Sequence, residues 1–148
     1  LSGKAQVKGH CAIIGGGLVG TETAEYVLEK GCSVSIVEMM DKIANGESST
    51  ILPIIMADFA KHGVKQYVNT KVNSIEDDGK KILAIDTKEE KEITIDCDMI
   101  IMAVGSKKNA IDVEGVTVPV YYAGDCAGER TASIAEAIRT GYKVANEI

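Results

Sequence analysis

A glycine-rich turn between two short apolar runs constrains the fold of this chain more than any other feature. The first run, His10–Ile14, leads into residues 15–20, whose sequence is Gly-Gly-Gly-Leu-Val-Gly. A helical segment follows, and the second run, Ser33–Val37, ends at Glu38. This order of strand, glycine turn, helix, strand and acid is typical of a βαβ unit that carries a dinucleotide-binding fingerprint.

Each part of the fingerprint has its own physical role. Gly15 lets the chain turn sharply after the first strand, and Gly17 has no Cβ, so a pyrophosphate can approach the backbone. Gly20 lets the helix pack closely on the strand, and the helix N-terminus offers unpaired N–H groups to phosphates. Glu38 can accept hydrogen bonds from the adenosine ribose hydroxyls and would repel a 2′-phosphate. The pattern therefore predicts NADH rather than NADPH as the ligand.

Two other interpretations compete with dinucleotide binding. Glycine-rich turns also occur in loops that bind nothing, but the strand, the helix and the acid around this turn favour nucleotide binding. A methyltransferase can use a similar turn and a ribose-binding acid, and the end of the chain argues against that class.

The composition limits the classes of function. With 148 residues, 45% hydrophobic and 26% charged, the chain has the size and profile of one globular domain. The net charge of −6 and the scattered lysines argue against a nucleic-acid surface. No apolar run approaches the length of a membrane span, and residues 1–8 lack the apolar core of a signal peptide. We therefore expect a cytoplasmic protein with neither nucleic acid nor membrane as its partner.

The cysteines and histidines predict no metal site and no catalytic residue. The four cysteines form no C-x-x-C pair and have no zinc-binding spacing. We expect Cys11, Cys32 and Cys97 to be small buried hydrophobes, whereas the role of Cys126 stays open. His62 precedes a glycine at a predicted helix end, where a cation suits the helix dipole.

The hydrophobic periodicity predicts an α/β fold: a Rossmann-like parallel sheet with a β-meander crossover. Residues 1–9 are expected to be a linker. Helices are predicted at 18–30, 50–62 and 133–148, and a meander of alternating strands at 71–76, 81–87 and 92–97. The remaining strands are predicted at 10–14, 33–37, 64–68, 99–104 and 118–123, of which 99–104 should be a buried parallel strand because it is continuously apolar.

Several side chains have two interpretations. Glu22 is either an acid that favours the dipole in the first helical turn or a polar contact near the nicotinamide, and the residues alone favour the first. Met39 and Met40 either line an adenine slot or belong to the core, and the core is favoured. The last helix carries an apolar stripe at Ile134, Ile138 and Tyr142, which needs a sheet to lie on.

The chain resembles the pyridine-nucleotide domain of two-dinucleotide flavoproteins. The resemblance rests on residues 12–24, on Glu38, on the Ala-x-Gly strand end within 98–105, and on the Gly-Asp segment within 120–126 that precedes the last helix. Within that superfamily it is closest to the C-terminal part of enoate reductases and 2,4-dienoyl-CoA reductases, which are NADH:flavin oxidoreductases. One departure is Ser106-Lys107-Lys108, where the family usually has a proline soon after the glycine.

The resemblance implies that the chain is a piece of a larger protein. Residues 10–117 would be the NAD-binding domain and 118–148 the C-terminal segment of an FAD-binding domain, whose first half would lie upstream. An FMN barrel and an iron–sulfur cluster are implied outside this chain. By position, Asp125 would contact the flavin ribityl or phosphate region, Glu22 would lie near the nicotinamide amide, and the turn at Gly105 would pass close to the nucleotide.

The resemblance implies a role in delivering hydride from NADH to FAD, with no catalytic residue in this chain. The alternatives are a disulfide reductase or NADH oxidase of the same superfamily, or a non-catalytic nucleotide-sensing module, which would have no use for the Gly-Asp segment. The missing FAD and FMN-barrel domains are the implied partners, and a homo-oligomer stays open. The candidate cofactor-binding residues are Gly15, Gly16, Gly17, Leu18, Val19, Gly20, Glu22, Glu38, Met39, Gly105, Gly124 and Asp125.

Overall fold

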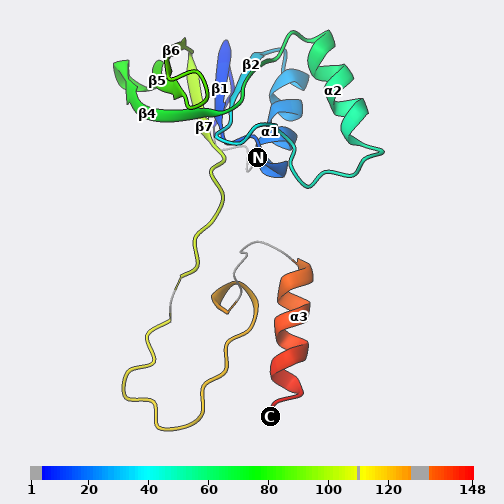
Figure 1. Cartoon of the computed structure of the whole chain (residues 1–148), viewed down its shortest axis with the longest axis vertical. Helices are drawn as coiled ribbons and strands as arrows, with labels where there is room; N and C mark the ends of the chain where they lie inside the picture. Colours follow the sequence, from blue (N-terminus) through cyan, green and yellow to red (C-terminus); the bar gives the residue numbers. More distant parts are fainter. Residues whose placement is uncertain (1–4, 110, 128–133) are drawn as a thin grey trace. The chain divides into compact units, whose positions relative to one another are not determined.

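The computed structural model describes residues 5–109, 111–127 and 134–148. The chain forms two compact units, residues 1–105 and 106–148. Figure 1 labels most of their helices and strands and colours them along the sequence. The division into an NAD-binding domain at 10–117 and an FAD-domain segment at 118–148 stays a prediction.

A four-stranded parallel sheet forms the centre of the first unit. Its order is β3-β2-β1-β7, with β1 at His10–Ile14, β2 at Ser33–Val37, β3 at Lys65–Tyr67 and β7 at Met99–Met102. Both neighbours of β1 run parallel to it. The Rossmann-like parallel sheet is thereby confirmed, and β1 and β2 begin and end at the residues that the sequence predicts.

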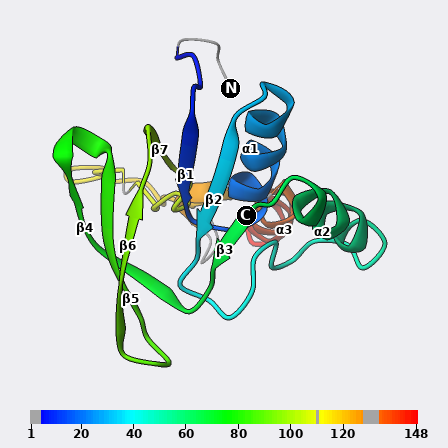
Figure 2. The same ribbon diagram turned by 90° about the horizontal axis from the view of Figure 1, so that it is seen from above.

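The predicted meander lies between β3 and β7 in the sequence. Strands β4 (Thr70–Glu76), β5 (Lys81–Asp86) and β6 (Lys91–Asp96) form an antiparallel sheet in that order. Figure 2 shows this small sheet on one side of the parallel sheet and the helices α1 (Leu18–Glu29) and α2 (Leu52–Lys61) on the other. The β-meander crossover is confirmed.

Two apolar clusters hold these layers together. One joins alternate residues of β1 and β2 to the helices, with Ala24 and Val27 of α1 and Phe59 of α2 among its buried members. The other joins the opposite face of the same strands to Ile82 and Ile95 of the meander. Both faces of β1 and β2 are therefore covered, which explains why their sequences are continuously apolar.

The cysteines in these clusters behave as core residues. Cys11 and Cys97 are buried, and burial raises the pKa of both thiols. Cys32 is half-buried and packs against the cluster that contains Cys11. His62 forms the C-cap of α2, and its Nδ1 lies 3.0 Å from the carbonyl oxygen of Asp58. Cys11, Cys97 and His62 thus have the structural roles that the sequence predicts, whereas Cys32 is less buried than predicted.

Strand β7 is less buried than its apolar sequence predicts. It is an edge strand that pairs only with β1, and Met102 at its end is 57% exposed. The described residues provide no strand along its other edge. The parallel orientation is thus confirmed for Met99–Met102, whereas residues 103 and 104 lie outside the strand and the prediction of a buried strand is wrong.

The second unit is simpler than the sequence predicts. It contains the short helix η2 (Gly124–Cys126) and the helix α3 (Ile134–Ala145). Residues 118–123 are not a strand, because the described part of this unit contains no strand with which they can pair. The apolar stripe of α3 is exposed, with Ile134 at 82%, Ile138 at 68% and Tyr142 at 73%, so the predicted covering sheet is not found in the described chain. Ser133, at which the last helix is predicted to begin, lies outside the described residues.

Candidate dinucleotide-binding site

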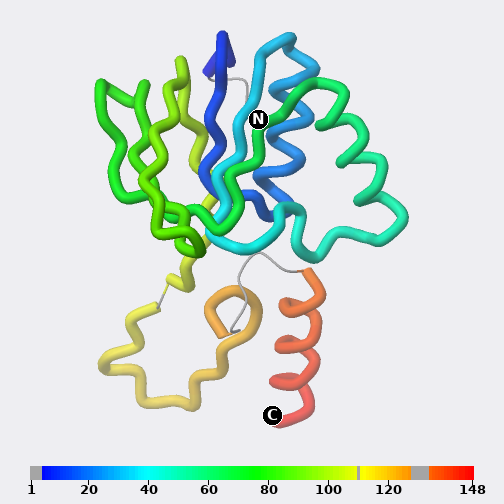
Figure 3. Tube along the Cα trace, turned by 45° about the horizontal axis from the view of Figure 1, so that its top comes forward, coloured from blue at the N-terminus to red at the C-terminus, as the bar shows by residue number. Residues whose placement is uncertain are grey.

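A cleft of about 660 Å³ lies at the carboxyl ends of β1, β2 and β7, beside the first residues of β4. In parallel α/β sheets, this is the edge at which ligands bind. Figure 3 shows the path of the chain from β1 through the glycine turn into α1. The residues that line the cleft are Ile14, Gly15, Gly17, Val37, Glu38, Met39, Thr70, Lys71, Val72, Ile75, Met102, Ala103, Val104 and Gly105.

The outer glycines of the turn are required by the fold itself. Gly15 has φ of 102°, and a Cβ there would lie 2.3 Å from the carbonyl oxygen of Ala103. At Gly20, a Cβ would lie 1.9 Å from the carbonyl oxygen of Gly15. These distances show that Gly15 makes the turn and that Gly20 brings α1 close to it, as the sequence predicts.

Gly17 differs from both, because space in front of it is open. It is the N-cap of α1 with φ of −68°, and a Cβ built on it meets no atom within 4 Å. No side chain caps this helix end. Among the described residues, none accepts a hydrogen bond from the N–H groups of Gly17, Leu18, Val19 or Gly20. An open space in front of unpaired N–H groups fits a pyrophosphate.

Glu38 is held at the cleft by the backbone. Its Oε2 accepts a hydrogen bond of 2.6 Å from the N–H of Gly16, and its Oε1 accepts one of 2.8 Å from the N–H of Met40. Each carboxylate oxygen can accept a further hydrogen bond. A carboxylate fixed in this way can accept hydrogen bonds from two vicinal ribose hydroxyls.

Other candidate residues lie near the turn but differ in what surrounds them. Met39 lines the cleft and is 61% exposed, while Met40 is 51% exposed, so the prediction that they belong to the core is wrong. Gly105 lines the cleft, and its closeness to a nucleotide stays a prediction. Glu22 is exposed and does not line the cleft. It also lies beyond the first turn of α1, which contains no acid, so the interpretation as a first-turn acid is wrong.

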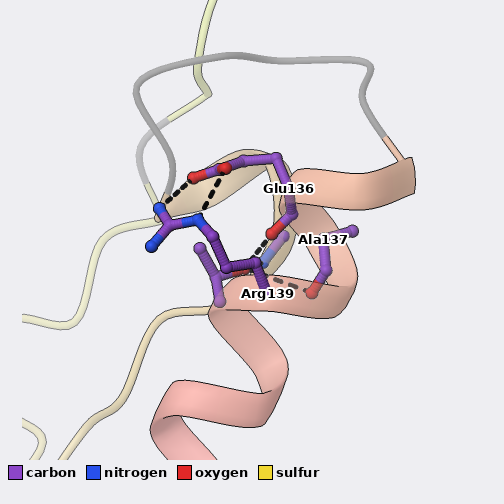
Figure 4. Close-up of polar contacts among 5 residues, drawn as sticks. Glu136, Ala137 and Arg139 are labelled. Carbon is purple, nitrogen blue, oxygen red and sulfur yellow. Dashed lines mark hydrogen bonds and ion pairs between the residues drawn. The ribbon is translucent and has the colours of Figure 1, made fainter.

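Gly124 and Asp125 belong to the second unit, where η2 packs against α3. The N–H of Gly124 donates a hydrogen bond of 2.8 Å to Oγ1 of the buried Thr140. That hydroxyl lies 2.8 Å from the carbonyl oxygen of Glu136. Figure 4 shows the neighbouring ion pair between Glu136 and Arg139, whose atoms approach to 2.5 Å. Hydrogen bonds through Thr140 thus link the Gly-Asp segment to α3.

The sequence interpretation missed the side of the cleft that the meander provides. Thr70, Lys71 and Ile75 of β4 line the cleft although they are more than 30 residues from Glu38 in the sequence. No motif marks them, because β4 reaches the site through hydrogen bonds from the N–H groups of Asn69 and Thr70 to the carbonyl oxygens of Met40 and Glu38, just after β2. In the described chain, no group of three or more potential metal ligands occurs, and no helix is both long and apolar enough to cross a membrane.

Comparison with protein families gives a match over most of the chain. The sequence model of the pyridine nucleotide-disulphide oxidoreductases matches residues 2–141. A bilirubin reductase of Mediterraneibacter gnavus is 40% identical over 141 residues, which cover 93% of this chain and 21% of that protein. An NADH oxidase of Streptococcus pneumoniae is 32% identical over 146 residues, which cover 86% of this chain and 31% of the oxidase.

Solved structures give the same picture. A 2-naphthoyl-CoA reductase in complex with 2-naphthoyl-CoA has a TM-score of 0.73 and 32% identity, covering 99% of this chain and 22% of the reductase. A thioredoxin reductase of T. acidophilum has a TM-score of 0.65 and 25% identity, covering 93% of this chain and 50% of that protein. The chain spans between a fifth and a third of the length of the two curated relatives named above.

Proposed function

The chain belongs to the pyridine nucleotide-disulphide oxidoreductase family, and from that premise we propose that it binds NADH in the cleft of its first unit. One observation carries the proposal: the open N-terminus of α1 and the carboxylate of Glu38 face the same cleft. The first supplies N–H donors for a pyrophosphate, and the second supplies acceptors for a ribose. This pair of groups matches the two polar parts of an adenine dinucleotide.

The proposed orientation follows from the positions of these two groups. With the adenosine ribose at Glu38 and the pyrophosphate at Gly17, the nicotinamide extends toward the β7 side of the cleft, where Ala103 and Gly105 lie. The nicotinamide, when bound, supplies a hydride. The residues of this chain bind and orient it, and none of them needs to act as an acid or a base.

We further propose that the chain is a piece of an NADH:flavin oxidoreductase of the enoate reductase and 2,4-dienoyl-CoA reductase group. Residues 118–148 would complete an FAD-binding domain, with Asp125 at the flavin, and FMN and an iron–sulfur cluster would lie outside the chain. The length of the relatives supports the first part of this proposal, that the chain is a piece of a longer protein, since the chain covers 21% of a bilirubin reductase and 22% of a 2-naphthoyl-CoA reductase. FAD would then be the hydride acceptor.

A second candidate is an NADH oxidase of the same family. It is favoured by the match to the Streptococcus pneumoniae enzyme of that name, which is 32% identical. Both candidates require the same NADH cleft, so the choice between them concerns the parent protein and leaves the proposed site unchanged. A nucleotide-sensing module without redox chemistry would share the cleft as well.

The test is calorimetric titration of the chain with NADH and with NADPH. We expect NADH to bind more tightly, because Glu38 repels a 2′-phosphate. Glu38→Gln removes that charge and should narrow the preference by about fivefold or more. Glu92→Gln, on the exposed part of β6 away from the cleft, is the matched control. Equal affinity of the unmodified chain for the two nucleotides, or no binding of NADH, would contradict the proposal.

A further inference from the structure

The charges that line the cleft are few and of opposite sign. Glu38 is the one acid among the described residues that line it, and Lys71 is the one base. A dinucleotide carries a negative charge on each of its two phosphates. Without Lys71, the cleft would present a net negative side-chain charge to an anionic ligand, and the partial positive charge of a helix N-terminus, about half an elementary charge, would not offset it.

The backbone fixes the position of Lys71 beside the ribose-binding end of the cleft. The preceding residue, Thr70, donates its N–H to the carbonyl oxygen of Glu38 at 2.8 Å. Asn69 donates its N–H to the carbonyl oxygen of Met40, also at 2.8 Å. Lys71 itself is paired with Ile85 in the β4–β5 ladder. The start of β4 is thus bound on one side to the end of β2 and on the other to β5.

The Lys71 ammonium has no ion-pair partner among the described residues. Lys71 is exposed, and the structure records no hydrogen bond from its side chain within the described chain. An ammonium group has three donors and a flexible stem. A lysine of this kind that lines a cleft is available to an anionic ligand.

We propose that Lys71 contacts a phosphate of the dinucleotide, on its adenylate half. This inference rests on the proposed function. The adenylate phosphate is the group next to the ribose in the ligand, and Lys71 follows directly the residue whose N–H is bonded to Glu38. The N-terminus of α1 and the side chain of Lys71 on β4 then both contact the pyrophosphate. Glu38 binds the ribose.

The experiment uses Lys71→Met, which removes the charge and keeps an unbranched stem, and Lys71→Arg, which restores the charge. Lys65→Met is the matched control, because Lys65 is also an exposed strand lysine but does not line the cleft. NADH, NADPH, ADP, 2′-AMP and adenosine are titrated by calorimetry at low and high salt. We expect Lys71→Met to weaken NADH and ADP by about three- to fivefold at low salt and to leave adenosine unchanged. The loss should shrink at high salt, and Lys71→Arg and Lys65→Met should bind like the unmodified chain.

Two results would overturn the inference while the proposed function stands. One is unchanged binding of NADH and ADP by Lys71→Met at low salt. The other is a loss confined to NADPH and 2′-AMP, which would assign Lys71 to a 2′-phosphate. If the unmodified chain binds no NADH, the proposed function and the inference fail together. Circular dichroism of each variant checks that the fold is intact.

Discussion

A glycine-to-alanine substitution at Gly17 or at Gly20 can separate the role of the turn in binding from its role in folding. Each is replaced by alanine in a separate variant. At Gly17 the added methyl group meets no protein atom within 4 Å, whereas at Gly20 it would lie 1.9 Å from the carbonyl oxygen of Gly15. We expect Gly17→Ala to impair NADH binding in a folded chain, and Gly20→Ala to destabilise the fold.

The expected magnitudes follow from these distances. In Gly20→Ala, α1 must move away from the turn by roughly 1.5 Å to reach ordinary van der Waals contact, and such overpacking costs about 1–3 kcal/mol. In Gly17→Ala, alanine is a poorer N-cap than glycine, but it also lowers the entropy of the unfolded chain, so the net change is within about 1 kcal/mol. The methyl group would displace a bound pyrophosphate from one or two N–H donors, which corresponds to a loss of about tenfold or more in affinity.

Urea unfolding followed by circular dichroism measures the first effect, and calorimetric titration with NADH measures the second. We expect Gly20→Ala to lower the free energy of unfolding. We expect Gly17→Ala to weaken NADH binding without a matching loss of stability. Unchanged NADH binding by a folded Gly17→Ala variant would refute the placement of the pyrophosphate on this turn. Equal unfolding free energies for Gly20→Ala and the unmodified chain would refute the close packing of α1.

Three further predictions concern other parts of the chain. The isolated chain should bind no FAD and oxidise no NADH, because in the proposed assignment Asp125 would supply only one side of a flavin site; yellow protein after gel filtration with FAD, or turnover above the free-flavin rate, would contradict this. Hydrogen bonds from the N–H groups of Glu89 and Lys88 lower the pKa of the Asp86 carboxyl. The free energy of unfolding should therefore fall as the pH drops through the acid range, and this fall should be smaller in Asp86→Asn. Phe59→Ala should cost about 3–5 kcal/mol in the same urea measurement, because Phe59 is fully buried between α2 and the sheet; a loss below about 1 kcal/mol would contradict the packing.

The first unit could be predicted from the sequence because its constraints are local or periodic. The glycine turn fixes the link between β1 and α1. The helix α1 ends at Glu29, one residue before the predicted end, and the left-handed Gly31, with φ of 77°, follows its C-cap. Alternation in 70–96 identifies the meander. The burial of β7 could not be predicted, because an apolar run does not reveal whether a strand lies at the centre or at the edge of its sheet.

The candidate site was predictable only in part, for a related reason. The residues of the turn and Glu38 belong to one continuous motif, so their spacing identifies them. Lys71 and Ile75 reach the cleft because β4 begins where β2 ends, and only the hydrogen bonds of residues 69 and 70 to the end of β2 establish that proximity. Glu22 was misassigned to the first helical turn although the predicted and the observed helix both begin at Leu18, because it is the fifth residue of α1 and a helical turn has about 3.6 residues.

The second unit contains two apolar patterns that are not buried in the described chain. Residues 118–123 have the sequence of a strand, but a strand is stable only when its backbone groups have ladder partners, and the described part of this unit supplies none. The stripe of Ile134, Ile138 and Tyr142 likewise has the spacing of a buried helix face although these side chains are exposed. Both features of this segment, the strand-like residues 118–123 and the apolar face of α3, need a sheet that the described part of the unit does not contain. This is typical of a segment that completes a sheet formed by other residues. This supports the proposal that residues 118–148 finish a second domain of a longer flavoprotein, in which 118–123 gains its ladder and α3 covers the sheet.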